Sequence, residues 1–240
     1  MFNQVFNSLL TLAYPQICHL CENSVENYSD GVACRTCWEK TQIFSGKENL
    51  CEKCGAYLNE AETKVATFCH RCDEHFYDAA RAVGVYENAL AASIVHLKRE
   101  PFVAKELRRL FLSAFYNSPF GDADLLIPVP LSKMRLLERG FNQASVLANI
   151  LKKETKINGD DKSLTRIIHT PMHRAGMDEK ARETTVVNAF EVSRKELIKN
   201  KTILLVDDVY TSGATVSSCA KVLKEKGASK VYVLTIARAS

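Results

Sequence analysis

The sequence predicts an α/β fold with a parallel sheet, preceded by a small cysteine-rich module that depends on metal. Eight of the nine cysteines form four C-x-x-C pairs, all before residue 73. From about Asp78 onward, short apolar runs alternate with segments of helical periodicity, which is the pattern of a parallel sheet with crossover helices. One of these runs, Ile203–Val206, leads into two acids and a small polar turn.

The totals are those of one or two globular domains. The chain has 240 residues, of which 46% are hydrophobic, and no window approaches ~18 consecutive apolar residues, so no transmembrane helix is expected. The first 16 residues contain no Lys or Arg and no small-residue cleavage site. They predict a short amphipathic helix and not a signal peptide. A cytoplasmic location is the corresponding expectation.

The four C-x-x-C pairs predict two structural Zn²⁺ sites. Each pair lets two thiolates face one ion, and four thiolates complete a closed tetrahedral site. Twelve residues separate the first two pairs and fourteen separate the last two, which suits two sequential zinc ribbons. The expected ligands are Cys18, Cys21, Cys34, Cys37, Cys51, Cys54, Cys69 and Cys72.

Spacing alone leaves other arrangements open. The pairs could interleave, first with third and second with fourth. A disulfide framework would require an oxidising compartment, and redox or iron–sulfur chemistry suits this spacing less well. Metal is favoured because residues 18–75 hold few large apolar side chains, and a hydrophobic core this small needs a cross-link such as a bound metal to be stable. His19, His70 and His75 are expected to be neighbours of the sites and not ligands, and Cys219 to be a core residue.

The later elements can be placed by their apolar patterns. Strands are expected at Ala82–Tyr86, Leu125–Val129, Ser163–Ile168, Ala189–Val192, Ile203–Val206 and Val231–Ala237, and helices at Ala89–Lys98, Phe102–Tyr116, Phe141–Lys153 and Ala214–Lys226. Pro101 separates the first two helices, and Gly227 fits the end of the last. The expected domains are the zinc module, 1–78, and the α/β domain, 79–240.

The acidic pair and the turn after it predict a site for a phosphorylated sugar. Asp207 and Asp208 lie where the Ile203–Val206 strand is expected to end, and carboxylates accept hydrogen bonds from sugar hydroxyls. The turn that follows offers consecutive backbone N–H groups at a helix N-terminus, which bind phosphate.

The string from Leu204 to Thr215 resembles the phosphoribosyl-pyrophosphate (PRPP) signature of type I phosphoribosyltransferases. The resemblance implies that Asp207 and Asp208 are catalytic and hold the ribose hydroxyls, and that Mg²⁺ binds with PRPP. It also implies that the 5′-phosphate contacts are Thr211, Ser212, Gly213, Ala214 and Thr215.

A second segment is expected on the same edge of the sheet. Residues 130–143 follow the Leu125–Val129 strand as a basic loop before a helix, where Lys133, Arg135 and Arg139 could bind a diphosphate. Its motif, I-P-V-P-L-x-x-x-R-x-x-x-R-G-F-N-Q, resembles the ComF family of competence-associated, phosphoribosyltransferase-like proteins. The Leu97-Lys98 pair and the four C-x-x-C pairs extend the resemblance over essentially the whole chain. Residues 173–185 resemble the mobile segment that closes over such sites, with Arg174, Lys180 and Arg182 as candidate diphosphate contacts.

The resemblance implies a PRPP-binding protein that acts in uptake of single-stranded DNA during natural transformation. One alternative is an active phosphoribosyltransferase that transfers phosphoribosyl to a nitrogenous acceptor and releases pyrophosphate; no segment identifies an acceptor pocket. A second is a zinc-ribbon scaffold for a DNA-uptake helicase.

Charge is unevenly distributed along the chain. Residues 1–80 carry six Lys/Arg and eleven Asp/Glu, and the remainder carries 26 and 17. Any DNA contact is therefore expected in the C-terminal part. Candidate side chains for a basic groove with stacking aromatics are Lys98, Arg99, Lys105, Arg108, Arg109, Phe102, Phe111 and Phe115. The helical spacing of these aromatics favours a core role instead.

Overall fold

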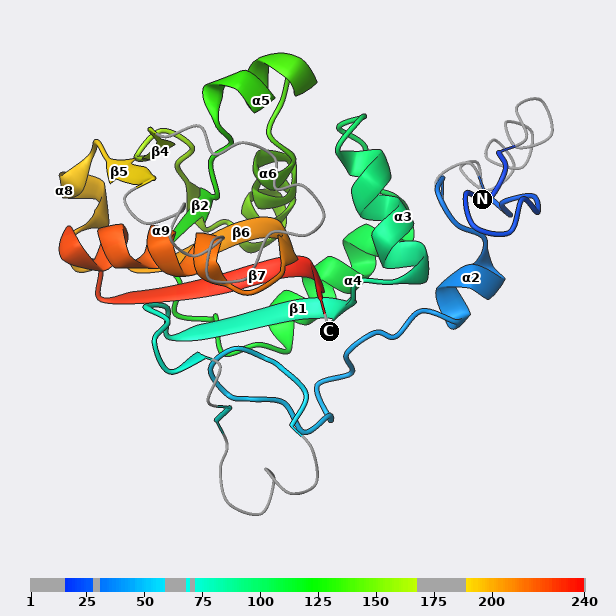
Figure 1. Cartoon of the computed structure of the whole chain (residues 1–240), viewed down its shortest axis with the longest axis horizontal. Helices are drawn as coiled ribbons and strands as arrows, with labels where there is room; N and C mark the ends of the chain where they lie inside the picture. Colours follow the sequence, from blue (N-terminus) through cyan, green and yellow to red (C-terminus); the bar gives the residue numbers. More distant parts are fainter. Residues whose placement is uncertain (1–15, 28–30, 59–67, 70–71, 168–188, 240) are drawn as a thin grey trace, which may run out of the picture.

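A computed structural model of the chain describes residues 16–27, 31–58, 68–69, 72–167 and 189–239. Its centre is a five-stranded parallel sheet in the order β1-β7-β6-β2-β3, with a separate antiparallel pair, β4-β5 (Figure 1). The strands are β1 (Ala79–Val85), β2 (Leu125–Pro128), β3 (Asn158–Gly159), β4 (Leu164–Arg166), β5 (Phe190–Val192), β6 (Thr202–Tyr210) and β7 (Lys230–Arg238). The parallel α/β class is confirmed, and every expected strand is present with bounds shifted by a few residues.

The helices are α2 (Arg35–Glu39), α3 (Asn88–Leu97), α4 (Lys105–Tyr116), α5 (Lys133–Arg139), α6 (Gln143–Thr155), α8 (Lys195–Ile198) and α9 (Ala214–Glu225). The prediction of a basic loop throughout residues 130–143 is wrong, because α5 occupies its middle. Ser132 Oγ caps this helix by accepting the Arg135 amide at 3.4 Å, and Gly140 ends it in the left-handed region at φ +77°. Figure 1 shows α5 standing away from the sheet.

The sheet has a hydrophobic layer on each face. Leu126, Leu204 and Leu234 pack with α3, α4 and α6 on one face. Ile127 and Leu205 pack on the other with α9, with the β4-β5 pair and with the second group of cysteines. Parallel sheets are buried on both faces, which explains the continuous apolar run at the start of β6. The second cysteine group therefore replaces part of a helical layer.

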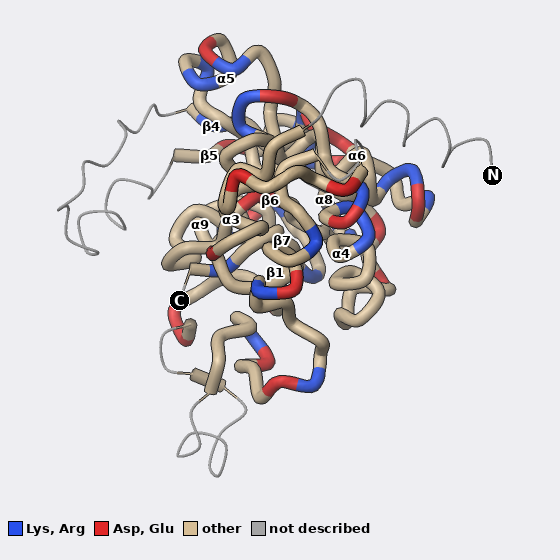
Figure 2. The backbone as a smooth tube through the Cα atoms, turned by 90° about the vertical axis from the view of Figure 1, so that its right-hand side faces the viewer, with Lys and Arg blue, Asp and Glu red and all other residues tan. Residues whose placement is uncertain are grey.

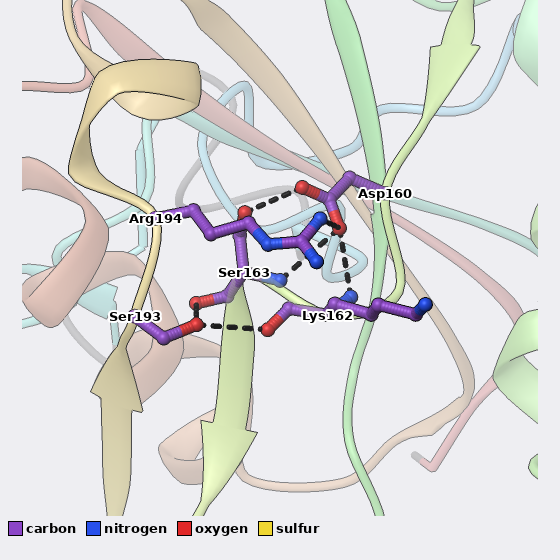
Figure 3. Close-up of polar contacts among 5 residues, drawn as sticks. All are labelled: Asp160, Lys162, Ser163, Ser193 and Arg194. Carbon is purple, nitrogen blue, oxygen red and sulfur yellow. Dashed lines mark hydrogen bonds and ion pairs between the residues drawn. The ribbon is translucent and has the colours of Figure 1, made fainter.

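The β4-β5 pair is anchored beside the sheet by Asp160 (Figure 3). The Asp160 carboxylate accepts the backbone amides of Lys162 at 2.7 Å and Ser163 at 3.1 Å, accepts the Ser163 hydroxyl, and lies 3.8 Å from the guanidinium of Arg194. Burial opposes ionisation of Asp160, but these hydrogen bonds outweigh it and lower its pKa. Ser193 Oγ donates to the Lys162 carbonyl at 3.0 Å. These contacts hold in place the start of β4, the strand that ends at Arg166.

The structure settles the role of the aromatic side chains on α4. Phe111 and Phe115 are buried in the core, as their helical spacing favoured. Arg109 pairs with Glu106 at 2.5 Å, and Arg108 pairs with Glu154. Figure 2 shows acidic and basic residues interspersed around α4 and α6. This surface is a mixed, solvated face and not a basic groove with stacking aromatics.

Candidate functional site

The eight paired cysteines form two groups of four, and within each group all Sγ atoms lie within 4.8 Å of one another. The Sγ–Sγ distance is 3.7 Å for Cys18–Cys37 and 3.4 Å for Cys54–Cys69. Zn–S bonds of about 2.3 Å in a tetrahedron place sulfur atoms about 3.8 Å apart. Both groups therefore fit structural zinc. The sequential pairing, first with second and third with fourth, is confirmed, and the interleaved pairing is excluded.

The two cysteine groups have different surroundings. In the first group Cys21 is exposed, and the buried members pack with Ala89 at the start of α3. In the second group all four members are buried in the hydrophobic core that also contains the strands. Burial raises the pKa of the Cys54 thiol to about 11. A bound cation supplies the charge that lets four thiolates share such a space.

The two acids lie within β6 and not beyond its end, which corrects the expected boundary at Val206. Each carboxylate accepts the amide of the next residue: Asp207 Oδ1 from Asp208 at 2.8 Å, and Asp208 Oδ1 from Val209 at 3.0 Å. The alternation of the strand changes phase here. Before the acids the even-numbered Leu204 and Val206 pack on the α3 side of the sheet, whereas after them the odd-numbered Val209 packs on that side and Tyr210 on the opposite one.

Asp208 is 6% exposed, and its second oxygen is the more informative one. Among the described residues, Oδ2 accepts no hydrogen bond. The charge partner of Asp208 is Lys98, the C-cap residue of α3. The distance from Lys98 Nζ to Asp208 Oδ2 is 3.2 Å. The contact is thus an ion pair outside hydrogen-bonding geometry, and it leaves a buried acceptor available to a ligand hydroxyl.

Asp207 has a different environment. Burial, and then the charge of Asp208, raise the pKa of Asp207 well above its usual value. It is close enough to Arg166 and Cys219 to influence both electrostatically. Burial, and then the Asp207 charge, raise the pKa of the Cys219 thiol well above its usual value, so this cysteine is a buried neutral core residue, as predicted.

The polar turn, residues 211–215, connects β6 to α9. Gly213 is the N-cap of α9 with φ +85°, and no side chain caps the helix. Of the first-turn amides of this twelve-residue helix, that of Ala214 makes a long contact of 3.4 Å to Ser212 Oγ, and the cap residue, a glycine, offers no side-chain acceptor. A helix N-terminus of this kind can bind an anion. A methyl group added at Gly213 would lie 2.3 Å from the Tyr210 hydroxyl oxygen, so glycine is required at this position for space as well as for its φ.

The basic residues expected to hold a diphosphate divide into two groups. Arg135 lies near Arg166: burial, and then the Arg135 charge, lower the pKa of Arg166. Arg166, which sequence reasoning missed, also interacts with Asp207 and stacks over Phe190 at 5.5 Å. Arg139 instead donates to Gln143 at 2.8 Å, and Lys133 is exposed on α5. The structure thus brings Arg135 near Arg166, and it turns Arg139 toward α6.

The remaining predicted residues fall into two sets. Arg174, Lys180 and Arg182, the expected mobile-segment contacts, lie outside the described residues. Lys98 is part of the family resemblance and a candidate for DNA contact, but the sequence gives it no role in the sugar-phosphate site; the structure pairs it with Asp208. The Leu97-Lys98 pair was a signal in the sequence, but its partner is 110 residues away and no local pattern identifies it.

Comparison with known proteins agrees with this geometry. The chain matches the double zinc ribbon domain over residues 9–77 and the phosphoribosyl transferase domain over residues 136–240. No helix within the described ranges is long and apolar enough to cross a membrane.

Three relatives match almost end to end. The DNA utilization protein YhgH of Shigella flexneri is 30% identical over 236 residues, covering 95% of this chain and 99% of the relative. Competence protein F of Haemophilus influenzae is 28% identical over 231 residues, covering 92% and 96%. Competence protein ComFC of Bacillus subtilis is 25% identical over 250 residues, covering 92% and 95%. With its two zinc ribbons and phosphoribosyltransferase-like sheet, the chain belongs to the ComF family of these competence and DNA utilization proteins.

Proposed function

We propose that this protein binds PRPP at the carboxyl end of β6, and that this binding serves the uptake or use of DNA. One observation carries the proposal: Asp208 Oδ2 is a buried carboxylate oxygen without a hydrogen bond among the described residues, five positions before Gly213, the glycine N-cap of α9. A ribose hydroxyl would donate to this oxygen, and the 5′-phosphate would accept from the helix amides.

The proposed roles follow from position. Asp207 and Asp208 hold the ribose hydroxyls, and residues 211–215 hold the 5′-phosphate. Arg166 on β4, which is close enough to Asp207 to interact with its charge, and Arg135 on α5, which lies near Arg166, would hold the diphosphate, as arginine forks do. Lys133 adds charge on the exposed side of α5. Mg²⁺ bound with the diphosphate would neutralise part of its charge.

Two observations bear on the broader role. The names of the relatives support a role in DNA uptake. The mixed charges on α4 give no reason to place single-stranded DNA on that helix. Transfer of phosphoribosyl to an acceptor and docking of a helicase on the zinc module remain alternatives.

Calorimetric titration of the zinc-loaded protein with PRPP and Mg²⁺ tests the site. We expect micromolar binding in the wild type and at least a tenfold loss in Asp208→Asn. Asp122→Asn is the matched control, because Asp122 is a surface acid paired with Lys230. Lys230 is the first residue of β7, at the end of the strand away from the proposed site. Absence of binding in the wild type, or equal binding in both variants, would refute the proposed site. Pyrophosphate release with a panel of bases then distinguishes binding from catalysis.

The DNA role is tested in cells. The chain and its two variants would be expressed in Haemophilus influenzae lacking competence protein F, and transformation frequency would be measured. We expect the wild type and Asp122→Asn to restore transformation and Asp208→Asn to restore little. Restoration by Asp208→Asn equal to that of the wild type would separate DNA uptake from PRPP binding.

A further inference from the structure

The residues that support the polar turn come from the zinc module and not only from the sheet. Gly213 stands against two side chains: an added Cβ would lie 2.3 Å from the Tyr210 hydroxyl oxygen and 2.8 Å from His75 Cε1. His75 comes three positions after Cys72, the last predicted ligand of the second ribbon, and its amide donates to the Cys72 carbonyl at 3.1 Å. His75 therefore connects the polar turn directly to the second cysteine group: its ring lies against Gly213, and its amide is bonded to Cys72.

These side chains form a closed hydrogen-bonded cluster. His75 Nδ1 lies 2.7 Å from the Tyr77 hydroxyl, which lies 2.5 Å from the Tyr210 hydroxyl, which in turn lies 3.4 Å from His75 Nδ1. Tyr77 is 1% exposed and Tyr210 is 4% exposed. A buried and mutually satisfied polar network has little freedom to rearrange, so it fixes the position of whatever packs on it.

Two further contacts tie the same regions together. The amide of Phe76 donates to Ser217 Oγ in the first turn of α9 at 3.1 Å. Arg238, at the end of β7, stacks over the Tyr210 ring at 4.4 Å and donates to the carbonyl of Cys54 at 2.6 Å. The turn and the start of α9 are thus held from the ribbon at His75 and Phe76, and Tyr210 is linked through Arg238 to a predicted zinc ligand.

The first cysteine group packs elsewhere in the part of the chain that the structure describes. Its buried members pack with Ala89 and Trp38, near α3. The two cysteine groups have the same chemistry, but among the described residues only the second is connected to the polar turn, through His75. The first group can therefore serve as an internal control.

We propose that the second zinc ribbon is a structural part of the ribose-phosphate site, with His75 and Tyr210 as positioning residues that set the conformation of Gly213 and hence the affinity for the 5′-phosphate. This inference rests on the proposed function. It goes further by assigning phosphate affinity to residues outside the PRPP signature and to the metal that orders them.

The coupling is testable because it is reciprocal. If zinc in the second ribbon strengthens phosphate binding, phosphate binding must retain that zinc by the same factor. The zinc affinity of the full-length protein would be measured by equilibrium competition with a chromogenic chelator, with and without saturating ribose 5-phosphate. We expect one of the two ions to be bound about three- to tenfold more tightly with ligand and the affinity for the other to be unchanged. Tightening that is lost in Cys54→Ala and kept in Cys21→Ala assigns the ion.

A second variant avoids dependence on cysteine mutants that fail to fold. Tyr210→Phe keeps the ring and removes the hydroxyl that faces Gly213. We expect about three- to tenfold weaker binding of ribose 5-phosphate, in line with the loss of one buried hydrogen bond. Tyr232→Phe is the matched control. The Tyr232 hydroxyl contacts Asp122 at 3.4 Å, and Tyr232 lies near the start of β7, away from the polar turn.

The outcomes separate the two proposals. Normal ligand binding by Tyr210→Phe, together with unchanged affinity for both zinc ions, would overturn the coupling and leave the PRPP site intact. Failure of the wild type to bind ribose 5-phosphate or PRPP would overturn both.

Discussion

The ion pair between Lys98 and Asp208 predicts an asymmetric response to mutation. Lys98 is 34% exposed at its side chain and Asp208 only 9%. Lys98→Met leaves a buried carboxylate without its cation, whereas Asp208→Asn leaves a lysine that can turn into solvent. Lys98→Met is therefore expected to be the more destabilising change, although each variant removes one charge of the same pair.

The magnitude follows from the distance. At 3.2 Å, and with an effective dielectric constant near 20, two unit charges attract by about 5 kcal/mol before desolvation. Exposed pairs yield about 0.2–1 kcal/mol, and breaking buried pairs costs about 3–5 kcal/mol. The intermediate exposure of this pair places Lys98→Met at about 1–2 kcal/mol. For a chain of this size, that corresponds to a decrease in Tm of about 2–8 °C.

The assay is a double-mutant cycle by urea unfolding at fixed zinc concentration. Lys98→Met, Asp208→Asn and the double variant give the coupling free energy of the pair, expected at about 1 kcal/mol or more. Lys105→Met, at an exposed lysine on α4, is the control and is expected to be near neutral. Additive effects, or an Asp208→Asn variant less stable than Lys98→Met, would refute the ion pair as the reason for the placement of Lys98.

Three further predictions follow from the same site. Asp207→Asn is expected to raise Tm while abolishing PRPP binding. Its folded-state pKa is raised, so its charge lowers stability above that pKa, and the gain should shrink as pH falls through it in thermal melts. Cys54→Ala is expected to lower the urea midpoint more than Cys21→Ala, because only the second cysteine group lies in the core of the sheet; equal effects would contradict this assignment. Arg166→Gln is expected to weaken PRPP binding at least tenfold by calorimetry while changing ribose 5-phosphate binding little, and an equal loss for both ligands would remove Arg166 from the diphosphate site.

Much of the fold was predictable because its signals are local. The apolar run of β6 and the small residues after it identify a strand, a turn and a helix without reference to the rest of the chain. The sequential pairing of the C-x-x-C pairs was favoured by the gaps between them. In each case the residues that determine the structure are close in sequence.

The missed features depend on contacts between distant segments. α5 has no buried residue, and Leu137 on it is 84% exposed, so it carries no apolar periodicity to identify it. The partner of Lys98 and the approach of Arg166 to Asp207 arise only when the sheet assembles. The same is true of His75, whose neighbour Gly213 is 138 positions away.

The position of the second cysteine group explains why a ribbon with a thin core and a parallel sheet occur together. The sheet needs an apolar cover on both faces, and on the α9 side part of that cover is the cysteine group with Tyr77 and Ala80. The ribbon in turn gains a hydrophobic surface that its own few apolar side chains cannot provide. The amide of Ala80 donates to the Lys53 carbonyl at 2.6 Å, and a Cβ at Gly55 would lie 2.8 Å from the Ala80 carbonyl, so the two backbones are in direct contact. Zinc in this group would therefore stabilise the sheet as well as the ribbon, and the first group, which lies beside α3, would not have this effect to the same extent.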